Sequence, residues 1–225
     1  MSDAGESQRP FDRLRVLAVQ EVEIAEGLRH VEIYTLEGLL TLFWHGPAAA
    51  EHVLLTCGGA MGGLLGPSGG LFHDLGMRLA ARGIGTIRIG YRRPNDLARC
   101  TLDVGAAADV ANRGGGKRFV IMGHSFGGAV AVNAAVALRR VTRGVLTLST
   151  QSAGCENAGA LGDIPLLLVH GDRDELLPVE ASEAVRTIAG HGEVVVLPGT
   201  GHLLLGVEQP LRERSLAWIA ERFGA

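Results

Sequence analysis

Three short stretches of the sequence carry side chains that together could attack a carbonyl group. GHSFG holds Ser125 between two glycines, HGDRDELLP holds Asp172 and Asp174, and PGTGH ends at His202. A serine hydroxyl is a poor nucleophile near neutral pH unless a base accepts its proton and an acid orients that base. These residue types therefore suggest acyl-transfer chemistry, provided that the fold brings them together.

The elements around these stretches indicate how they could meet. From residue 53 onward, short apolar runs alternate with segments of helical periodicity. Continuous apolar runs are typical of strands buried on both faces, and strand–helix alternation is typical of a parallel sheet with helices on both sides. The sequence thus predicts an α/β fold with a mostly parallel central sheet. The predicted strands are 53–56, 85–90, 118–122, 144–148, 165–169 and 193–197, and the predicted helices are 70–82, 96–112, 126–140, 179–190 and 207–223.

The first quarter of the chain has a different pattern. Residues 14–24 and 30–44 are apolar-rich, Gly27 separates them, and Gly46-Pro47 ends the second, which predicts two antiparallel N-terminal strands. Residues 1–13 are polar and are expected to form a loose tail. No internal repeat or Pro/Ser-rich linker divides the 225 residues, so a single domain over residues 1–225 is expected.

In a parallel sheet, side chains that follow the carboxyl ends of different strands meet at one edge. Ser125, Asp174 and His202 each follow a separate predicted strand, in that chain order. The pattern G-x-S-x-G is that of a sharp strand-to-helix turn, where side chains at the two glycine positions would clash. Such a turn exposes the hydroxyl and sets it at a helix N-terminus, which favours developing negative charge.

The three motifs resemble those of the α/β-hydrolase superfamily, and in particular its lidless serine esterases and dienelactone-hydrolase-like members. The resemblance covers about residues 53–223 and implies Ser125 as nucleophile, Asp174 as acid and His202 as base. The family pattern counts three residues from Gly171, which favours Asp174 over Asp172; the latter is expected to brace the loop. Only residues 150–164 are available for a lid between two strands, which is too few for a lid domain.

Attack by the serine also requires donors for the negative charge that develops on the carbonyl oxygen. By resemblance, one donor is the backbone N–H of Phe126, the residue after the nucleophile. The other belongs to the loop after strand 53–56, where family members often carry His-Gly and this chain has CGGA. The N–H of Ala60 is the first choice there and that of Gly59 the second. Cys57 in the same loop is expected to be buried and inert rather than a reactive thiol.

Composition restricts the other classes of function. The formal net charge is −3 and no Lys/Arg cluster exceeds two residues, so nucleic-acid binding is not expected. Three scattered cysteines predict neither a disulfide framework nor a zinc site and favour a cytoplasmic location. The N-terminus lacks the apolar core of a secretion signal. The uncharged window 120–138 is interpreted as a strand, a turn and a helix rather than a membrane span.

We therefore expect a serine hydrolase that cleaves a small ester or thioester through an acyl-enzyme, without a metal or organic cofactor. Its expected partner is a small-molecule acyl substrate, with no nucleic acid and no membrane. Two alternatives stay open: an acyltransferase or lyase that uses the same three residues, and a non-catalytic ligand-binding homologue. Arg92 and Arg93, after strand 85–90, could hold a substrate carboxylate, although a structural role is favoured.

Overall fold

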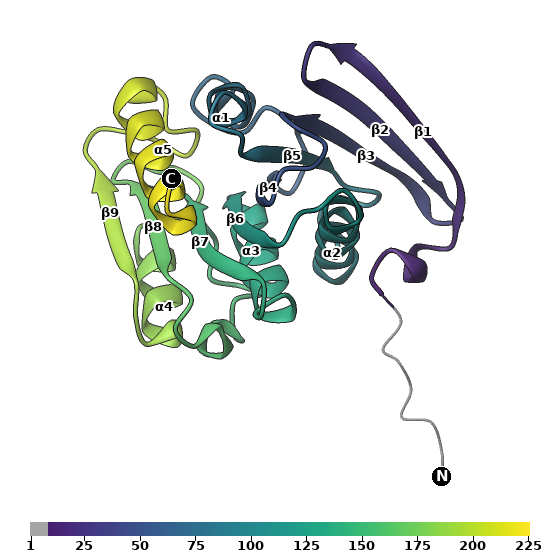
Figure 1. Cartoon of the computed structure of the whole chain (residues 1–225). Coiled ribbons are helices and arrows are strands. Elements are labelled where there is room, and N and C mark those ends of the chain that lie inside the picture. The colour runs from purple at the N-terminus through teal and green to yellow at the C-terminus, as the bar shows by residue number, and fades with distance from the viewer. Residues whose placement is uncertain (1–8) are drawn as a thin grey trace.

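A nine-stranded sheet runs through the computed structural model, which describes residues 9–225 (Figure 1). The strand order is β1-β2-β3-β5-β4-β6-β7-β8-β9, and all pairings from β5 to β9 are parallel. The mostly parallel sheet predicted from the apolar runs is thus confirmed. The parallel strands are β4 (His52–Cys57), β5 (Gly85–Gly90), β6 (Arg118–His124), β7 (Thr142–Leu148), β8 (Leu166–Gly171) and β9 (Glu193–Leu197).

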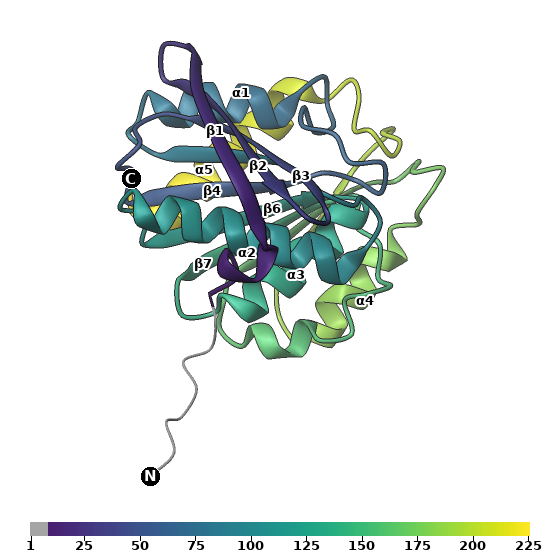
Figure 2. The same cartoon turned by 90° about the vertical axis from the view of Figure 1, so that its right-hand side faces the viewer.

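Helices cover both faces of this sheet, as Figures 1 and 2 show. Alternate residues of each central strand point to opposite faces, so the sheet contributes to two separate apolar clusters. One cluster includes helices α2 (Leu97–Arg113), α3 (Phe126–Ala137) and α4 (Glu180–Ala189). The other includes α1 (Leu71–Ala80) and α5 (Glu208–Phe223). Each predicted helix is present within about three residues of its expected bounds.

The N-terminal part holds three antiparallel strands rather than the two that were predicted. They are β1 (Val16–Ala25), β2 (Leu28–Thr35) and β3 (Gly38–His45), and β3 pairs antiparallel with β5. The segment predicted as one strand over 30–44 turns back at Leu36-Glu37. The Thr35 hydroxyl donates to the carbonyl oxygen of Gly38 (2.7 Å) and accepts from the N–H of Glu37 (3.1 Å), which closes the turn. Gly38 allows it with a φ of +133°.

Part of the segment expected as a loose tail, residues 1–13, packs against the fold. A 3₁₀ turn spans Asp12–Leu14, and Leu14 is fully buried. The N–H of Phe11 donates to Asp109 in α2 at 2.9 Å, and the guanidinium of Arg113 lies 4.2 Å from the centroid of the Phe11 ring. Residues 10–14 therefore pack against α2 instead of forming part of a loose tail. Residues 1–8 lie outside the described part of the chain.

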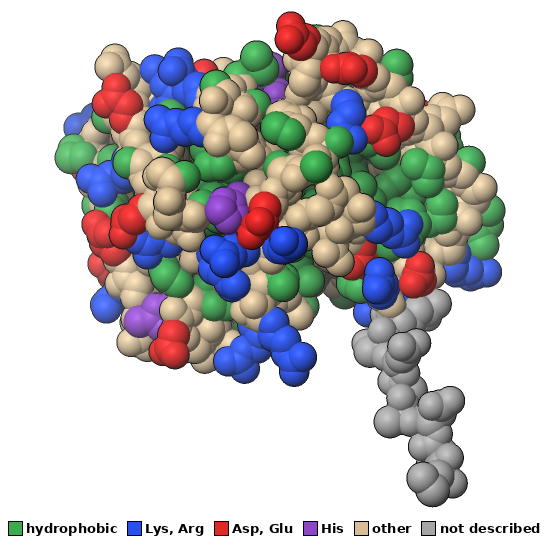
Figure 3. Space-filling model, in the orientation of Figure 1, with side chains coloured by type: hydrophobic (Ala, Val, Ile, Leu, Met, Phe, Trp, Pro, Cys, Tyr) green, Lys and Arg blue, Asp and Glu red, His purple; other side chains and the backbone are tan. Residues whose placement is uncertain are grey.

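The surface differs between the two edges of the sheet and its middle. Nearly every residue of β1 is exposed, including four large aliphatic side chains, and β9 is only half-buried, because each edge strand has a neighbour on one side alone. In Figure 3, side chains of both charges are spread over the face shown, as the nearly balanced composition predicts. Within residues 9–225, no helix is both long enough and apolar enough to span a bilayer. The window 120–138 forms β6, a turn and α3, as interpreted.

Candidate active site

Ser125 occupies the sharp turn between β6 and α3. Its φ of 56° and ψ of −123° are strained for a residue with a side chain, and its N–H is held by the carbonyl oxygen of Leu148 at 2.9 Å. A side chain at Gly123 would overlap the carbonyl oxygen of Gly127, and a side chain at Gly127 would overlap that of Cys57. The steric reason for glycine at both positions is thus confirmed: the backbone on either side of the serine is too close for a Cβ.

Asp174 and His202 lie on the loops after β8 and β9 and contact each other. His202 Nδ1 is 2.8 Å from Asp174 Oδ2, and both side chains are almost completely buried. Asp174 Oδ1 accepts from the N–H groups of Leu176 (2.9 Å) and Leu177 (2.8 Å). Burial by itself would raise the pKa of Asp174, but the hydrogen bonds from Leu177, His202 and Leu176 outweigh it, and the net pKa lies below the usual value. The carboxylate is therefore charged at neutral pH and holds the proton of His202 on Nδ1.

Asp172, the rival acid, has a different partner. Its Oδ1 accepts from the N–H of Gly199 at 2.6 Å, so it ties the loop after β8 to the loop that carries His202. Gly201 in that loop lies close to Glu175: a Cβ there would be 2.6 Å from Oε2, so the carboxylate would have to move. Glu175 also accepts from the N–H of His202 at 3.2 Å. Asp172 and Glu175 thus fix the loop, and Asp174 contacts the imidazole.

His124, next to Ser125 in the turn, packs against His202. The two ring centroids are 4.8 Å apart, and His124 Nε2 lies 3.0 Å from the backbone oxygen of His202. A carbonyl oxygen only accepts, so Nε2 carries a proton and donates it. Burial, followed by the charge of His202, lowers the pKa of His124 to about 4, which leaves it neutral at neutral pH. Sequence reasoning missed this contact, because nothing in the chain order shows which ring faces the His202 loop.

Ser125 and His202 open on one pocket of about 500 Å³. The glycine-rich loop 58–67 forms much of its wall, together with His124, Leu176 and Leu203. Four large apolar side chains of this lining are more than half exposed: Met61, Leu65, Leu176 and Leu203. The mouth of the pocket is therefore apolar, whereas its floor carries the polar side chains. Between β7 and β8 the chain forms only a 3₁₀ turn, Ala158–Leu161, so no helical lid is inserted there.

The backbone groups expected to bind an oxyanion lie around Ser125. Phe126 is the first residue of α3, so its N–H has no acceptor within the helix. Gly59 is beside the serine: a Cβ placed on it would lie 3.8 Å from Ser125 Cβ. Ala60 lines the same pocket, and the turn that contains it is closed by the Gly62 N–H donating to the Gly59 oxygen at 2.8 Å. Both choices for the second donor are consequently at the pocket wall.

Three polar side chains near the pocket, those of Cys57, Tyr91 and Arg92, have structural roles. Burial raises the pKa of Cys57 to about 12, so this thiol is inert, as expected. The hydroxyl of Tyr91 donates to the carbonyl oxygen of Gly58 at 3.3 Å and so supports the loop. Arg92 is buried in an ion pair with Asp103 (2.5 Å), which leaves it no access to a substrate carboxylate. Within residues 9–225, no group of three potential ligand side chains could hold a metal ion.

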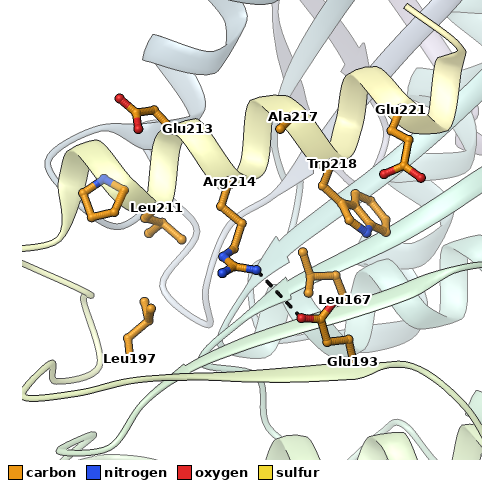
Figure 4. Close-up of a pocket in the computed structure, with 10 residues that line it drawn as sticks. Leu167, Glu193, Leu197, Leu211, Glu213, Arg214, Ala217, Trp218 and Glu221 are labelled. Atoms are coloured by element: carbon orange, nitrogen blue, oxygen red, sulfur yellow. Dashed lines mark ion pairs between the residues drawn. The ribbon is translucent and has the colours of Figure 1, made fainter.

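A second hollow, of about 580 Å³, lies between α5 and the edge formed by β8 and β9 (Figure 4). Its wall includes Trp218, Leu211 and the ion pair between Arg214 and Glu193, whose charged atoms are 3.8 Å apart. The residues that line this hollow do not include a serine or cysteine beside a histidine. This hollow therefore offers none of the chemistry that the sequence suggests for Ser125.

Comparison with known proteins agrees with this geometry. Residues 107–208 match the family model described as phospholipase/carboxylesterase. Est1E from Butyrivibrio proteoclasticus superposes with a TM-score of 0.73 at 19% identity, covering 87% of this chain and 99% of Est1E. Dienelactone hydrolase from Anabaena variabilis superposes with a TM-score of 0.70 at 17% identity, covering 91% and 97%. No curated protein matches the sequence. The nine-stranded sheet and these structural likenesses show that the chain has the α/β-hydrolase fold, and residues 107–208 are similar to the phospholipase/carboxylesterase family.

Proposed function

We propose that this protein is a serine hydrolase that cleaves a small ester or thioester through an acyl-enzyme. Ser125 is the nucleophile, His202 the general base and Asp174 the acid that orients it. One observation carries the proposal: the Asp174–His202 contact of 2.8 Å lies beside a pocket that Ser125 and His202 both line. The match to a family of phospholipases and carboxylesterases supports the same class of reaction.

The order of proton transfers follows from the contacts of His202. Its Nδ1–H is engaged by Asp174, so Nε2 is the nitrogen that takes the proton of the Ser125 hydroxyl as the oxygen attacks the carbonyl carbon. The imidazolium then gives this proton to the departing alkoxide or thiolate, and an acyl-enzyme remains. Water then attacks the acyl-enzyme: His202 takes a proton from the water and returns it to the Ser125 oxygen, and the carboxylic acid product is released. The charge of Asp174 stabilises the imidazolium in both halves of the reaction.

Backbone N–H groups supply the remaining stabilisation. Negative charge on the carbonyl oxygen is bound by the N–H of Phe126, at the N-terminus of α3, and by that of Ala60 or Gly59. Each such donor is worth on the order of 3–4 kcal/mol in the transition state. These assignments rest on the position of Phe126 after the nucleophile and on the approach of Gly59 to Ser125.

The lining of the pocket favours a substrate with a hydrocarbon part. The exposed side chains of Met61, Leu65, Leu176 and Leu203 can cover an acyl or alcohol group and remove it from water, at about 0.8 kcal/mol per buried methylene. Among the described residues that line this pocket there is no Asp, Glu, Lys or Arg. A neutral ester or thioester therefore fits it better than a charged one.

The test is Ser125→Ala, assayed with nitrophenyl esters and thioesters of increasing acyl length. We expect turnover to fall by about 10⁴-fold or more, with an unchanged circular dichroism spectrum. A fluorophosphonate probe should label the wild-type protein on the peptide that contains Ser125 and should not label the variant. Full turnover in the folded variant, or labelling at another residue, would refute the assignment.

A further inference from the structure

A second histidine lies against the same carboxylate oxygen as His202. His170, in β8, is fully buried, and its Nε2 is 3.2 Å from Asp174 Oδ2. The same oxygen is 2.8 Å from His202 Nδ1. Asp174 therefore faces two imidazole rings through one oxygen, while its other oxygen accepts two backbone N–H groups. The reaction proposed above uses only one of these rings.

The neighbours of His170 determine which of its nitrogens carries a proton. Its Nε2 is also 3.0 Å from the backbone oxygen of Leu177, so this nitrogen faces two groups that can only accept. Nε2 must therefore be protonated and must donate. Its Nδ1 lies 2.8 Å from the hydroxyl of Ser182 in α4, which is fully buried and can donate to it. A tautomer with its proton on Nε2 therefore satisfies every one of these contacts.

We propose that His170 is a positioning residue for the hydrolase reaction: its Nε2–H, which donates to the Leu177 oxygen, also lies against Asp174 Oδ2 and offsets part of the negative charge that this oxygen presents to His202. This inference rests on the proposed function of Ser125, Asp174 and His202. The positive end of the N–H dipole lies at His170 Nε2, 3.2 Å from Asp174 Oδ2, so His170 limits how far Asp174 stabilises the protonated base. It also prevents the carboxylate from turning towards the backbone and away from His202.

The other titratable groups around Asp174 and His202 do not reduce the negative charge that Asp174 presents to His202. From β6, His124 packs on His202, but burial keeps its pKa at about 4, and it stays neutral through the range in which an esterase is assayed. Glu175 contacts the backbone of His202 rather than its ring, and Asp172 contacts the backbone of Gly199. Ser182, from α4, is uncharged. Of these groups, only His170 and His202 lie within 3.2 Å of Asp174 Oδ2.

Two substitutions separate this role from packing. His170→Met removes the donor and keeps a buried apolar side chain of similar length, whereas His170→Gln keeps an N–H at about the reach of Nε2. For His170→Met we expect the acid limb of the plot of kcat/KM against pH to move to higher pH by about half to one unit, because Asp174 then stabilises protonated His202 more strongly. We also expect kcat to fall by about tenfold with little change in KM. His170→Gln should restore both. An unmoved acid limb, or equal effects of Met and Gln, would overturn the proposal.

A second measurement needs no turnover and covers the case in which His170→Met does not fold. Nitrogen-15 spectra of histidine-labelled wild-type and Ser125→Ala protein should show His170 neutral, with its proton on Nε2, and Asp174→Asn should shift that resonance. A proton on Nδ1 in the wild type, or no response to Asp174→Asn, would overturn the proposal. If Ser125→Ala stays active, the proposed function fails instead, and the tautomer of His170 is unaffected by that result.

Discussion

Replacing Asp174 by Asn should stop catalysis without changing the shape of the site. Asp174 Oδ1 accepts two backbone N–H groups, from Leu176 and Leu177, so the single oxygen of Asn is drawn to that position. The amide NH₂ then takes the place of Oδ2 and points at His202 Nδ1, which is 2.8 Å away. Two donors cannot face each other, so His202 is driven to the tautomer with its proton on Nε2. That tautomer cannot accept the proton of Ser125.

In a comparable Ser-His-Asp arrangement this change of tautomer lowers kcat by about 10⁴, which corresponds to about 5.4 kcal/mol on the barrier. Asp172→Asn is the matched control, because its oxygen can still accept from the N–H of Gly199 and only charge is lost. We expect less than a tenfold loss for it. The assay is kcat for a nitrophenyl ester, with thermal unfolding of both variants measured alongside. A larger loss in the Asp172 variant, or equal losses, would refute the assignment of the acid.

Three further predictions follow from particular contacts. Gly127→Ala should destabilise the fold by several kcal/mol and abolish hydrolysis, because its Cβ would overlap the carbonyl oxygens of Cys57 and Gly58; a stable, active variant in thermal unfolding and ester assays would contradict this. Burial, with the charge of Arg88 next in size, lowers the pKa of His45 to about 4. Since the unfolded state then takes up a proton first, the free energy of unfolding should fall by up to about 3 kcal/mol as the pH drops from 6.5 to 4, and His45→Leu should flatten this slope in denaturant titrations. Leu176→Ser should lower kcat/KM for a hexanoyl ester more than for an acetyl ester, whereas Leu17→Ser, an equally exposed leucine on β1, should change neither; parallel losses on both esters would exclude an acyl contact at Leu176.

Local patterns were sufficient for most of the architecture. Continuous apolar runs predicted β4 to β8 because strands buried on both faces rarely alternate with polar residues. These strands are indeed buried apart from single residues near their ends. The pattern failed at residues 30–44, because the two-residue turn Leu36-Glu37 adds only one charged residue to an apolar-rich segment. It also failed at Phe11, whose packing on α2 depends on Asp109 and Arg113, about a hundred residues away.

The sequence by itself determined which residues could do chemistry and on which loops they lie, because the G-x-S-x-G turn and the parallel topology follow from local sterics and from strand–helix alternation. Tertiary structure alone decided which groups meet. It brought His124 and His170 to the cluster of Asp174 and His202, and it placed four exposed apolar side chains around the pocket. These contacts join loops from β4, β6, β8 and β9, and their distances depend on how the strands twist and how each loop is held. No pattern within one segment contains that information, because the packing of several segments together fixes it.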